Sequence, residues 1–243
     1  MLSTLLNVLF PSHCPVCDTQ SDSHEHNPFC TACWNGIERY TGPACRCCGI
    51  PTVSRQTTHC ESCTEDAPPF ARILYYGIYE GALKEAVHLL KFGGLRRLSG
   101  PLGSLLAAAY DAPFIPSEGD ERCVEGIIPV PLSPARLRER EFNQTALLSS
   151  TLSKRLGIPL FLDVLAKSRE VPPQTEVRGR ERLKNIKNAF TVTGDVTGKR
   201  VLLVDDVITT GATVRECAKV LRKSGAESVT VVALARSLPK HVT

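Results

Sequence analysis

Residues 201–213 read VLLVDDVITTGAT, and this stretch decides the fold class. The apolar run 201–204 predicts a buried strand that ends at two carboxylates, Asp205 and Asp206, before a short loop opens a helix. The backbone N–H groups of such a loop can point at one anion, and Gly211 lets the chain approach it closely. The stretch therefore predicts a strand, a loop and a helix that together bind a phosphorylated ligand.

Two adjacent carboxylates would repel a phosphate unless they serve another group, such as ribose hydroxyls or a divalent cation. A sugar phosphate meets both demands, so we predict that Asp205 and Asp206 hold the ribose and are the catalytic carboxylates of any reaction there. The residues predicted to bind the phosphate are Thr209, Thr210, Gly211, Ala212 and Thr213. The alternative is an ordinary strand end followed by an N-capping threonine.

The segments around this stretch alternate between strands and helices. Strands are predicted at 73–79, 127–131, 201–204 and 229–235, with a further candidate at 160–167. Helices are predicted at 83–91, at 98–110, along the face marked by Leu148, Leu152 and Leu156, and along the stripe of Val214, Cys217, Ala218 and Leu221 before Gly225. This order predicts an α/β domain, with a parallel sheet flanked by helices, that spans residues 70–243.

Residues 1–69 differ from the rest because they hold nine of the eleven cysteines. Eight of these form Cys-x-x-Cys pairs: Cys14 and Cys17, Cys30 and Cys33, Cys45 and Cys48, Cys60 and Cys63. Two such turns complete a tetrahedral zinc shell with no open position, so we predict two structural Zn²⁺ sites. Sequential and crossed pairing both fit the spacing. Cys47 is surplus, and four histidines are either substitute ligands or loop residues.

Composition and charge narrow the class of protein. With 42% hydrophobic and 22% charged residues, most of the chain is expected to fold. The apolar run 5–10 is too short to span a membrane and lacks the pattern of a secretion signal, so we expect a cytoplasmic protein without membrane insertion. Residues 1–69 carry three basic and seven acidic side chains. The remaining 26 basic and 18 acidic ones favour a phosphorylated ligand or nucleic acid, or form a solvated surface.

The 201–213 stretch resembles the phosphoribosyl pyrophosphate (PRPP) motif of type I phosphoribosyltransferases. Together with the cysteines, residues 11–235 resemble the ComF/GntX family, which joins a double zinc ribbon to a phosphoribosyltransferase domain. The segment 128–144 resembles a family loop that ends in Arg-Gly-Phe-Asn-Gln, with Glu141 in place of glycine. The segment 167–190 resembles the long basic loop that closes over PRPP.

The resemblance implies further residues and a reaction. It suggests that Lys91 and Arg169 contact PRPP, although a lysine at a helix C-terminus is also favoured by the helix dipole. It implies Mg²⁺ as the cation that accompanies PRPP, and an Mg²⁺-dependent phosphoribosyltransferase or a PRPP-binding protein whose acceptor is open. Such a protein would act in DNA uptake, as in competence, or in the use of imported DNA. The alternative is a non-catalytic adaptor that binds single-stranded DNA and competence proteins such as a helicase.

Overall fold

The computed structural model describes residues 12–111, 124–168 and 186–238. A four-stranded sheet lies at its centre, in the order β1 (Arg72–Ile78), β6 (Ser228–Arg236), β5 (Arg200–Ile208), β2 (Gly126–Pro129). All three strand pairings are parallel. The predicted parallel α/β sheet is therefore confirmed, and its strands are the buried, branched runs that the sequence indicated.

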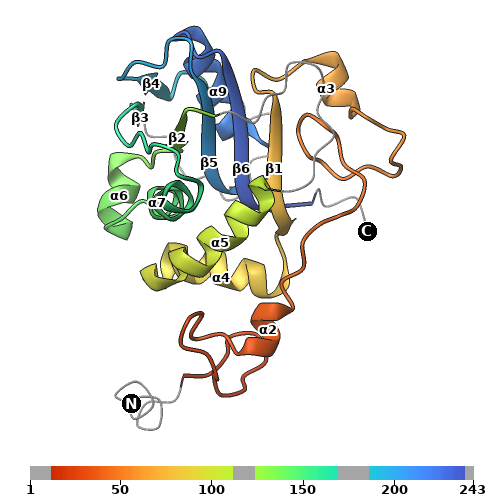
Figure 1. The fold of residues 1–243 in the computed structure, drawn as a ribbon, viewed down its shortest axis with the longest axis vertical. Coiled ribbons are helices and arrows are strands. Elements are labelled where there is room, and N and C mark those ends of the chain that lie inside the picture. The colour runs from red at the N-terminus through yellow and green to blue at the C-terminus, as the bar shows by residue number, and fades with distance from the viewer. Residues whose placement is uncertain (1–11, 112–123, 169–185, 239–243) are drawn as a thin grey trace.

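Helices cover both faces of this sheet (Figure 1). One face carries α4 (Gly81–Phe92), the short turn η1 (Arg96–Leu98), α5 (Ser99–Tyr110) and α7 (Gln144–Leu156), while α6 (Pro134–Arg140) precedes α7 at the end of β2. The other face carries α9 (Ala212–Lys223). The residue after its C-cap is Gly225, with φ of +94°, which any residue with a Cβ would adopt at a cost. The apolar stripes of the helices form one buried cluster on each face.

Two strand predictions needed correction at their boundaries. β5 continues to Ile208 because Val207 and Ile208 still pair with β6, so the two aspartates lie within the strand and not after it. In the candidate at 160–167, only β3 (Leu165–Lys167) is a strand, and it lies outside the main sheet. It pairs antiparallel with β4 (Phe190–Val192), while Leu160 keeps a single parallel bridge to Ile127.

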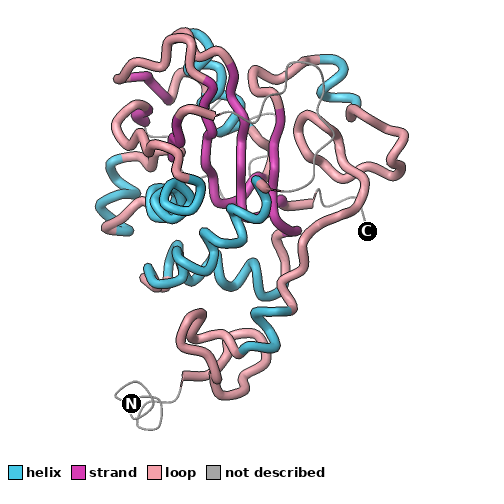
Figure 2. The backbone as a smooth tube through the Cα atoms, viewed as in Figure 1, coloured by secondary structure: helices cyan, strands magenta, loops and turns pink. Residues whose placement is uncertain are grey.

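The two halves of the cysteine module lie against different parts of the larger domain. The first half, with α2 (Thr31–Asn35), lies below α4, and the second half, with α3 (Glu61–Glu65), lies beside β1 (Figures 1 and 2). Buried Phe29 and Ile37 belong to the same apolar cluster as Leu83 of α4. The module and the larger domain therefore share a core, and the boundary at residue 69 remains a prediction.

Hydrogen bonds also join the second half of the module to the sheet. The backbone N–H of Ile73 donates to the Cys47 carbonyl, and that of Tyr40 donates to the Tyr76 carbonyl, both at 2.8 Å. The Arg236 guanidinium at the end of β6 donates to the Cys48 carbonyl at 2.6 Å. The two backbone bonds cover the outer edge of β1, which would otherwise be open to pairing with another chain. Of the helices described, none is both long and apolar enough to cross a membrane.

Candidate ribose-phosphate site and zinc sites

The two adjacent aspartates of β5 face opposite sides of the sheet, because side chains alternate along a strand. Asp206 is buried and faces the layer of α4 and α7, where it meets Lys91 and Gln144. Asp205 faces the α9 side, near Cys217 and Lys167. The two carboxylates therefore lie on opposite faces of the sheet and in different environments, although the sequence predicted the same role for both.

Asp206 is held by residues from two helices. The Lys91 ammonium at the end of α4 lies 2.6 Å from Asp206 Oδ1, and its side chain is only 16% exposed. The Gln144 amide at the start of α7 donates to Asp206 Oδ2 at 2.7 Å. Lys91 therefore lies in the candidate site and is not a solvated helix end. The resemblance implies a contact with PRPP, whereas in this structure the ammonium contacts the Asp206 carboxylate.

The segment before α7 belongs to the family-like loop 128–144, and the structure adds two of its residues to the candidate site. Asn143 accepts a hydrogen bond from the Thr145 N–H, which caps α7 and sets the position of Gln144. Arg140 stacks over the Phe92 ring at 4.5 Å from its centroid, next to Lys91 in the chain. Gln144 and Arg140 are therefore site residues that the motif alone could have suggested.

Glu141, which stands where glycine was expected, ends α6 in the left-handed conformation with φ of +63°. A side chain is strained there, which explains the preference for glycine at this position. Its carboxylate lies 3.2 Å from the Arg96 guanidinium, but both side chains are largely exposed, so this pair stabilises the turn little. The turn expected from the resemblance is present despite the substitution.

The electrostatics of Asp205 are unusual for an aspartate. Its withdrawal from water and the neighbouring Asp206 charge raise its pKa to about 7, and Lys91 opposes this shift. The Asp206 N–H donates to Asp205 Oδ1 at 2.8 Å and also favours the charged form. The carboxyl group is therefore near the midpoint of its titration at neutral pH.

The predicted phosphate loop follows β5 directly. Thr209 and Thr210 are exposed, Gly211 has φ of +77° and precedes α9, and Ala212 is buried at the first turn. A Cβ on Gly211 would meet no atom within 4 Å, so the glycine is required by its backbone conformation and not by crowding within the chain. The exposed loop and the N-terminus of α9 together leave a surface open to an anion.

The cysteines gather into two clusters with sequential pairing. One contains Cys14, Cys17, Cys30 and Cys33, the other Cys45, Cys48, Cys60 and Cys63, and within each the sulfur atoms lie within 4.8 Å of one another. Contacts between neighbouring pairs measure 3.6 Å, as expected for sulfurs about 2.3 Å from a shared zinc ion. Both clusters fit structural Zn²⁺, and the crossed pairing is excluded.

Cys47, His26 and His13 lie outside the two cysteine clusters. Cys47 is partly buried and packs against Phe70 and Ile73. His26 stacks on Trp34 at 4.9 Å between centroids, and His13 bonds to Asp18, so neither replaces a cysteine. Of the remaining sequence predictions, Arg169 and most of the basic loop lie outside the described residues.

Comparisons with known proteins agree with this architecture. Residues 145–241 match the phosphoribosyl transferase domain model, and residues 5–64 match the double zinc ribbon domain model. The chain is 34% identical to competence protein F of Haemophilus influenzae, covering 87% of this chain and 91% of the relative. It is 32% identical to DNA utilization protein YhgH of Shigella flexneri, over 88% of this chain and 92% of that one.

Two matches of lower sequence identity are also found. Competence protein ComFC of Streptococcus pneumoniae is 29% identical, over 86% of this chain and 87% of the relative. A solved glutamine PRPP amidotransferase from B. subtilis is 25% identical with a TM-score of 0.36. That match covers 55% of this chain and 25% of the amidotransferase.

A parallel sheet flanked by helices, with two four-cysteine clusters before it, defines a phosphoribosyltransferase-like protein with a double zinc ribbon. Within that class the chain belongs to the family of competence protein F and DNA utilization protein YhgH, the ComF/GntX family.

Proposed function

We propose that the chain binds PRPP, or another 5′-phosphorylated ribose, at the carboxyl end of β5. The observation that carries this proposal is the convergence there of β5, α4, α7 and the N-terminus of α9. Two carboxylates, a partly buried lysine and a glutamine amide lie beside an open loop that begins a helix. Ligands of open α/β sheets bind outside the carboxyl ends of the strands, and helix N-termini favour phosphate.

Each group has a role in this proposal. The N–H groups and hydroxyls of 209–213 hold the 5′-phosphate, and the carboxylates accept hydrogen bonds from the ribose hydroxyls. Gln144 fixes Asp206 through one oxygen, and Lys91 neutralises it through the other until pyrophosphate competes for the ammonium. Arg169 contacts PRPP from the basic loop. Mg²⁺, bound with pyrophosphate, would neutralise the leaving group.

If the bound PRPP reacts, the bond between ribose C1 and the pyrophosphate oxygen breaks and pyrophosphate leaves with the electron pair. Positive charge then develops on the sugar, where a charged Asp205 or Asp206 stabilises it. An acceptor nucleophile forms the new bond to C1. The chain itself contributes position and electrostatics, and the acceptor is outside this proposal.

Isothermal titration calorimetry with PRPP, with and without Mg²⁺, tests the binding. Asp205→Asn keeps the shape of the side chain but removes its charge, so PRPP affinity should fall several-fold or more. Asp163→Asn, at an exposed aspartate away from the site, is the matched control and should bind as the unmodified protein does. If the unmodified chain binds neither PRPP nor ribose 5-phosphate at millimolar concentration, the proposal fails.

The family role that we infer is DNA uptake or the use of imported DNA, which the names of competence protein F and YhgH support.

One surface favours a second candidate, an adaptor that binds single-stranded DNA and competence proteins. In α6, Arg136 and Arg138 are exposed beside Leu137, and exposed Phe92 lies under Arg140. Cations neutralise phosphates and exposed rings stack on bases.

Fluorescence anisotropy with an oligothymidylate separates the two candidates. Arg136→Gln combined with Arg138→Gln should weaken strand binding and reduce its salt dependence, while PRPP binding is retained. Strand binding that is insensitive to this change and to salt would reject the adaptor surface.

A further inference from the structure

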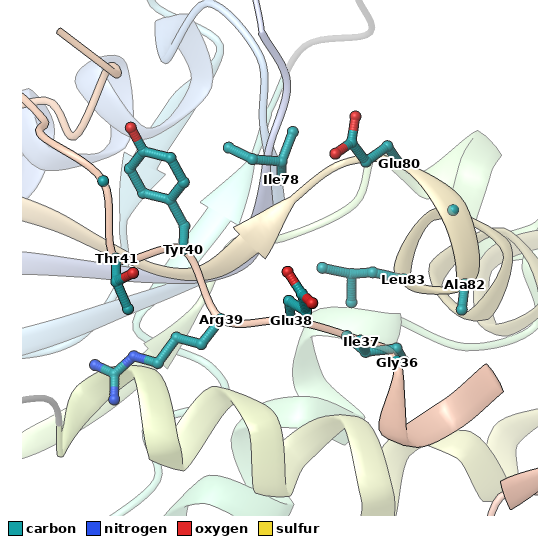
Figure 3. A pocket seen from close by; sticks show the side chains of 12 residues that line it. Gly36, Ile37, Glu38, Arg39, Tyr40, Thr41, Ile78, Glu80, Ala82 and Leu83 are labelled. Carbon is teal, nitrogen blue, oxygen red and sulfur yellow. The ribbon is translucent and has the colours of Figure 1, made fainter. Parts of the chain in front are cut away.

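Two hollows are both lined by the segment that joins the zinc-ribbon halves, and they differ in charge. The first, about 560 Å³, is lined by Glu38, Arg39 and Glu80 among others, so its charges are mixed. Figure 3 shows the Arg39 guanidinium pointing away from both glutamates. The second hollow, about 430 Å³, lies between the second ribbon half and β1. We name it the arginine pocket. Its lining includes Arg39, Arg46, Arg55, Arg72, Tyr40 and Tyr75 and no carboxylate, and Cys45 of the second cysteine cluster also borders it.

The arginine pocket is set apart by the composition of the module that forms it. Residues 1–69 contain seven acidic residues and only three basic ones, and the three are Arg39, Arg46 and Arg55. All three line this one pocket, where buried Arg72 of β1 joins them. In the described part of the chain, no carboxylate lies within 4.0 Å of Arg39, Arg46 or Arg55. The acidic module thus places all three of its basic side chains around one pocket, although Arg39 also borders the first hollow with its two glutamates.

Arginine is the side chain best suited to bind phosphate, because its planar guanidinium donates two parallel hydrogen bonds. Arg46 and Arg55 are exposed, and Arg55 donates a hydrogen bond to the Thr41 carbonyl at 3.3 Å, whereas Arg72 is buried within β1. Like charges that gather repel one another, and among the described residues no carboxylate lies within 4.0 Å of Arg39, Arg46 or Arg55, so this arrangement favours the binding of an anion.

The tyrosines give the pocket a flat aromatic wall. The rings of Tyr40 and Tyr75 stack with 5.7 Å between centroids and an interplanar angle of 26°. Gly49, with φ of +71°, brings the second ribbon half close to this wall, since a Cβ there would lie 2.9 Å from the Tyr75 ring. The buried Tyr75 hydroxyl has no hydrogen-bond partner among the described residues, which is uncommon for a buried polar group.

We propose that the arginine pocket binds the phosphate of a nucleotide, with the base against the tyrosine wall. Its volume is within the range of small-ligand sites, and arginine with aromatic side chains is the combination that recognises phosphate and base together. The phosphate comes either from a free mononucleotide or from the 5′-terminal nucleotide of a strand. The site is separate from the loop at 209–213, so it does not depend on PRPP binding there.

The experiment uses the zinc-loaded full chain and thymidine 5′-monophosphate, with thymidine as the uncharged counterpart. Calorimetry gives the affinity, and hydrogen exchange shows which residues are protected. We expect the monophosphate to protect 39–49 and 72–75, and Arg46→Gln combined with Arg55→Gln to weaken its binding by about tenfold or more. Lys154→Gln combined with Lys223→Gln removes the same charge at exposed positions elsewhere and should leave the affinity unchanged. Thr209→Ala combined with Thr210→Ala should lower the affinity for PRPP and leave the affinity for thymidine 5′-monophosphate unchanged.

A short oligothymidylate, tested with and without a 5′-phosphate, distinguishes the two sources of the phosphate. If a short oligothymidylate binds only when it carries a 5′-phosphate, and more tightly than the monophosphate, the ligand is a strand terminus. If the monophosphate binds at least as well, the ligand is a free nucleotide. The proposal is overturned if neither gives protection at 39–49, if protection appears only at 209–215, or if the two charge-matched variants lower affinity equally.

Discussion

The ion pair between Lys91 and Asp206 is the interaction on which the site most depends, and Lys91→Met tests it. Methionine keeps most of the length of the lysine stem but removes the ammonium. Among the described residues, the 6%-exposed Asp206 carboxylate then keeps the Gln144 amide as its side-chain hydrogen-bond partner. Breaking a buried pair from one side costs about 3–5 kcal/mol. Small domains unfold with about 5–15 kcal/mol, so about a fifth or more of the stability should be lost.

Urea unfolding of the zinc-loaded chain, followed by circular dichroism, measures this loss. Lys84→Met lies on the same helix, is exposed, and should change the free energy of unfolding by no more than about 0.5 kcal/mol. Adding Asp206→Asn to Lys91→Met removes the uncompensated charge and should recover much of the loss. If Lys91→Met is as mild as Lys84→Met, or if the double variant is no more stable than Lys91→Met alone, the ion pair does not hold the site together.

Three further predictions concern other parts of the chain. Removing zinc by chelation should increase hydrogen exchange not only in 14–63 but also in α4 and α5, because Phe29 and Ile37 share their core; a change confined to 14–63 would show an independent module. Glu141→Gly should stabilise the chain by about 0.5–1 kcal/mol by relieving the left-handed strain, whereas Glu139→Gly within α6 should destabilise it by about 1 kcal/mol; equal effects in urea unfolding would contradict this. Asp205, whose pKa rises from 3.8 to about 7 in the folded chain, holds a proton there that the unfolded chain releases. Its contribution to stability is therefore complete below pH 3.8 and is lost as the pH rises towards 7, and urea midpoints measured from pH about 5 to about 8 should show a flatter slope in Asp205→Asn.

The sequence predicted the elements around the site well because their signals are local. The apolar run before Asp205, the helical stripe through Cys217 and the glycine after it all reappear in β5, α9 and Gly225. The cysteine spacing likewise predicted two four-sulfur clusters, although only the structure distinguished sequential from crossed pairing. Local periodicity and short spacing are sufficient for such features.

The contacts between distant elements could not be predicted in the same way. Lys91 and Asp206 are 115 positions apart, and nothing in the local sequence indicates that α4 ends beside β5. The opposite orientation of Asp205 and Asp206 depends on β5 continuing to Ile208, which pairing with β6 decides and the apolar pattern does not. Long-range pairing overrides local preference at these places.

The bond from Arg236 to the Cys48 carbonyl spans 188 positions, and it has a consequence for synthesis on the ribosome. At about 5–20 residues per second, roughly 10–40 s pass between the emergence of Cys48 and that of Arg236. During this interval the second zinc ribbon can contact β1 but lacks β6, whose Arg236 holds the Cys48 carbonyl. So small a module can keep its shape before β6 is made only if zinc is bound. The metal supply during translation, and not only in the finished protein, should therefore govern how much of the chain folds correctly.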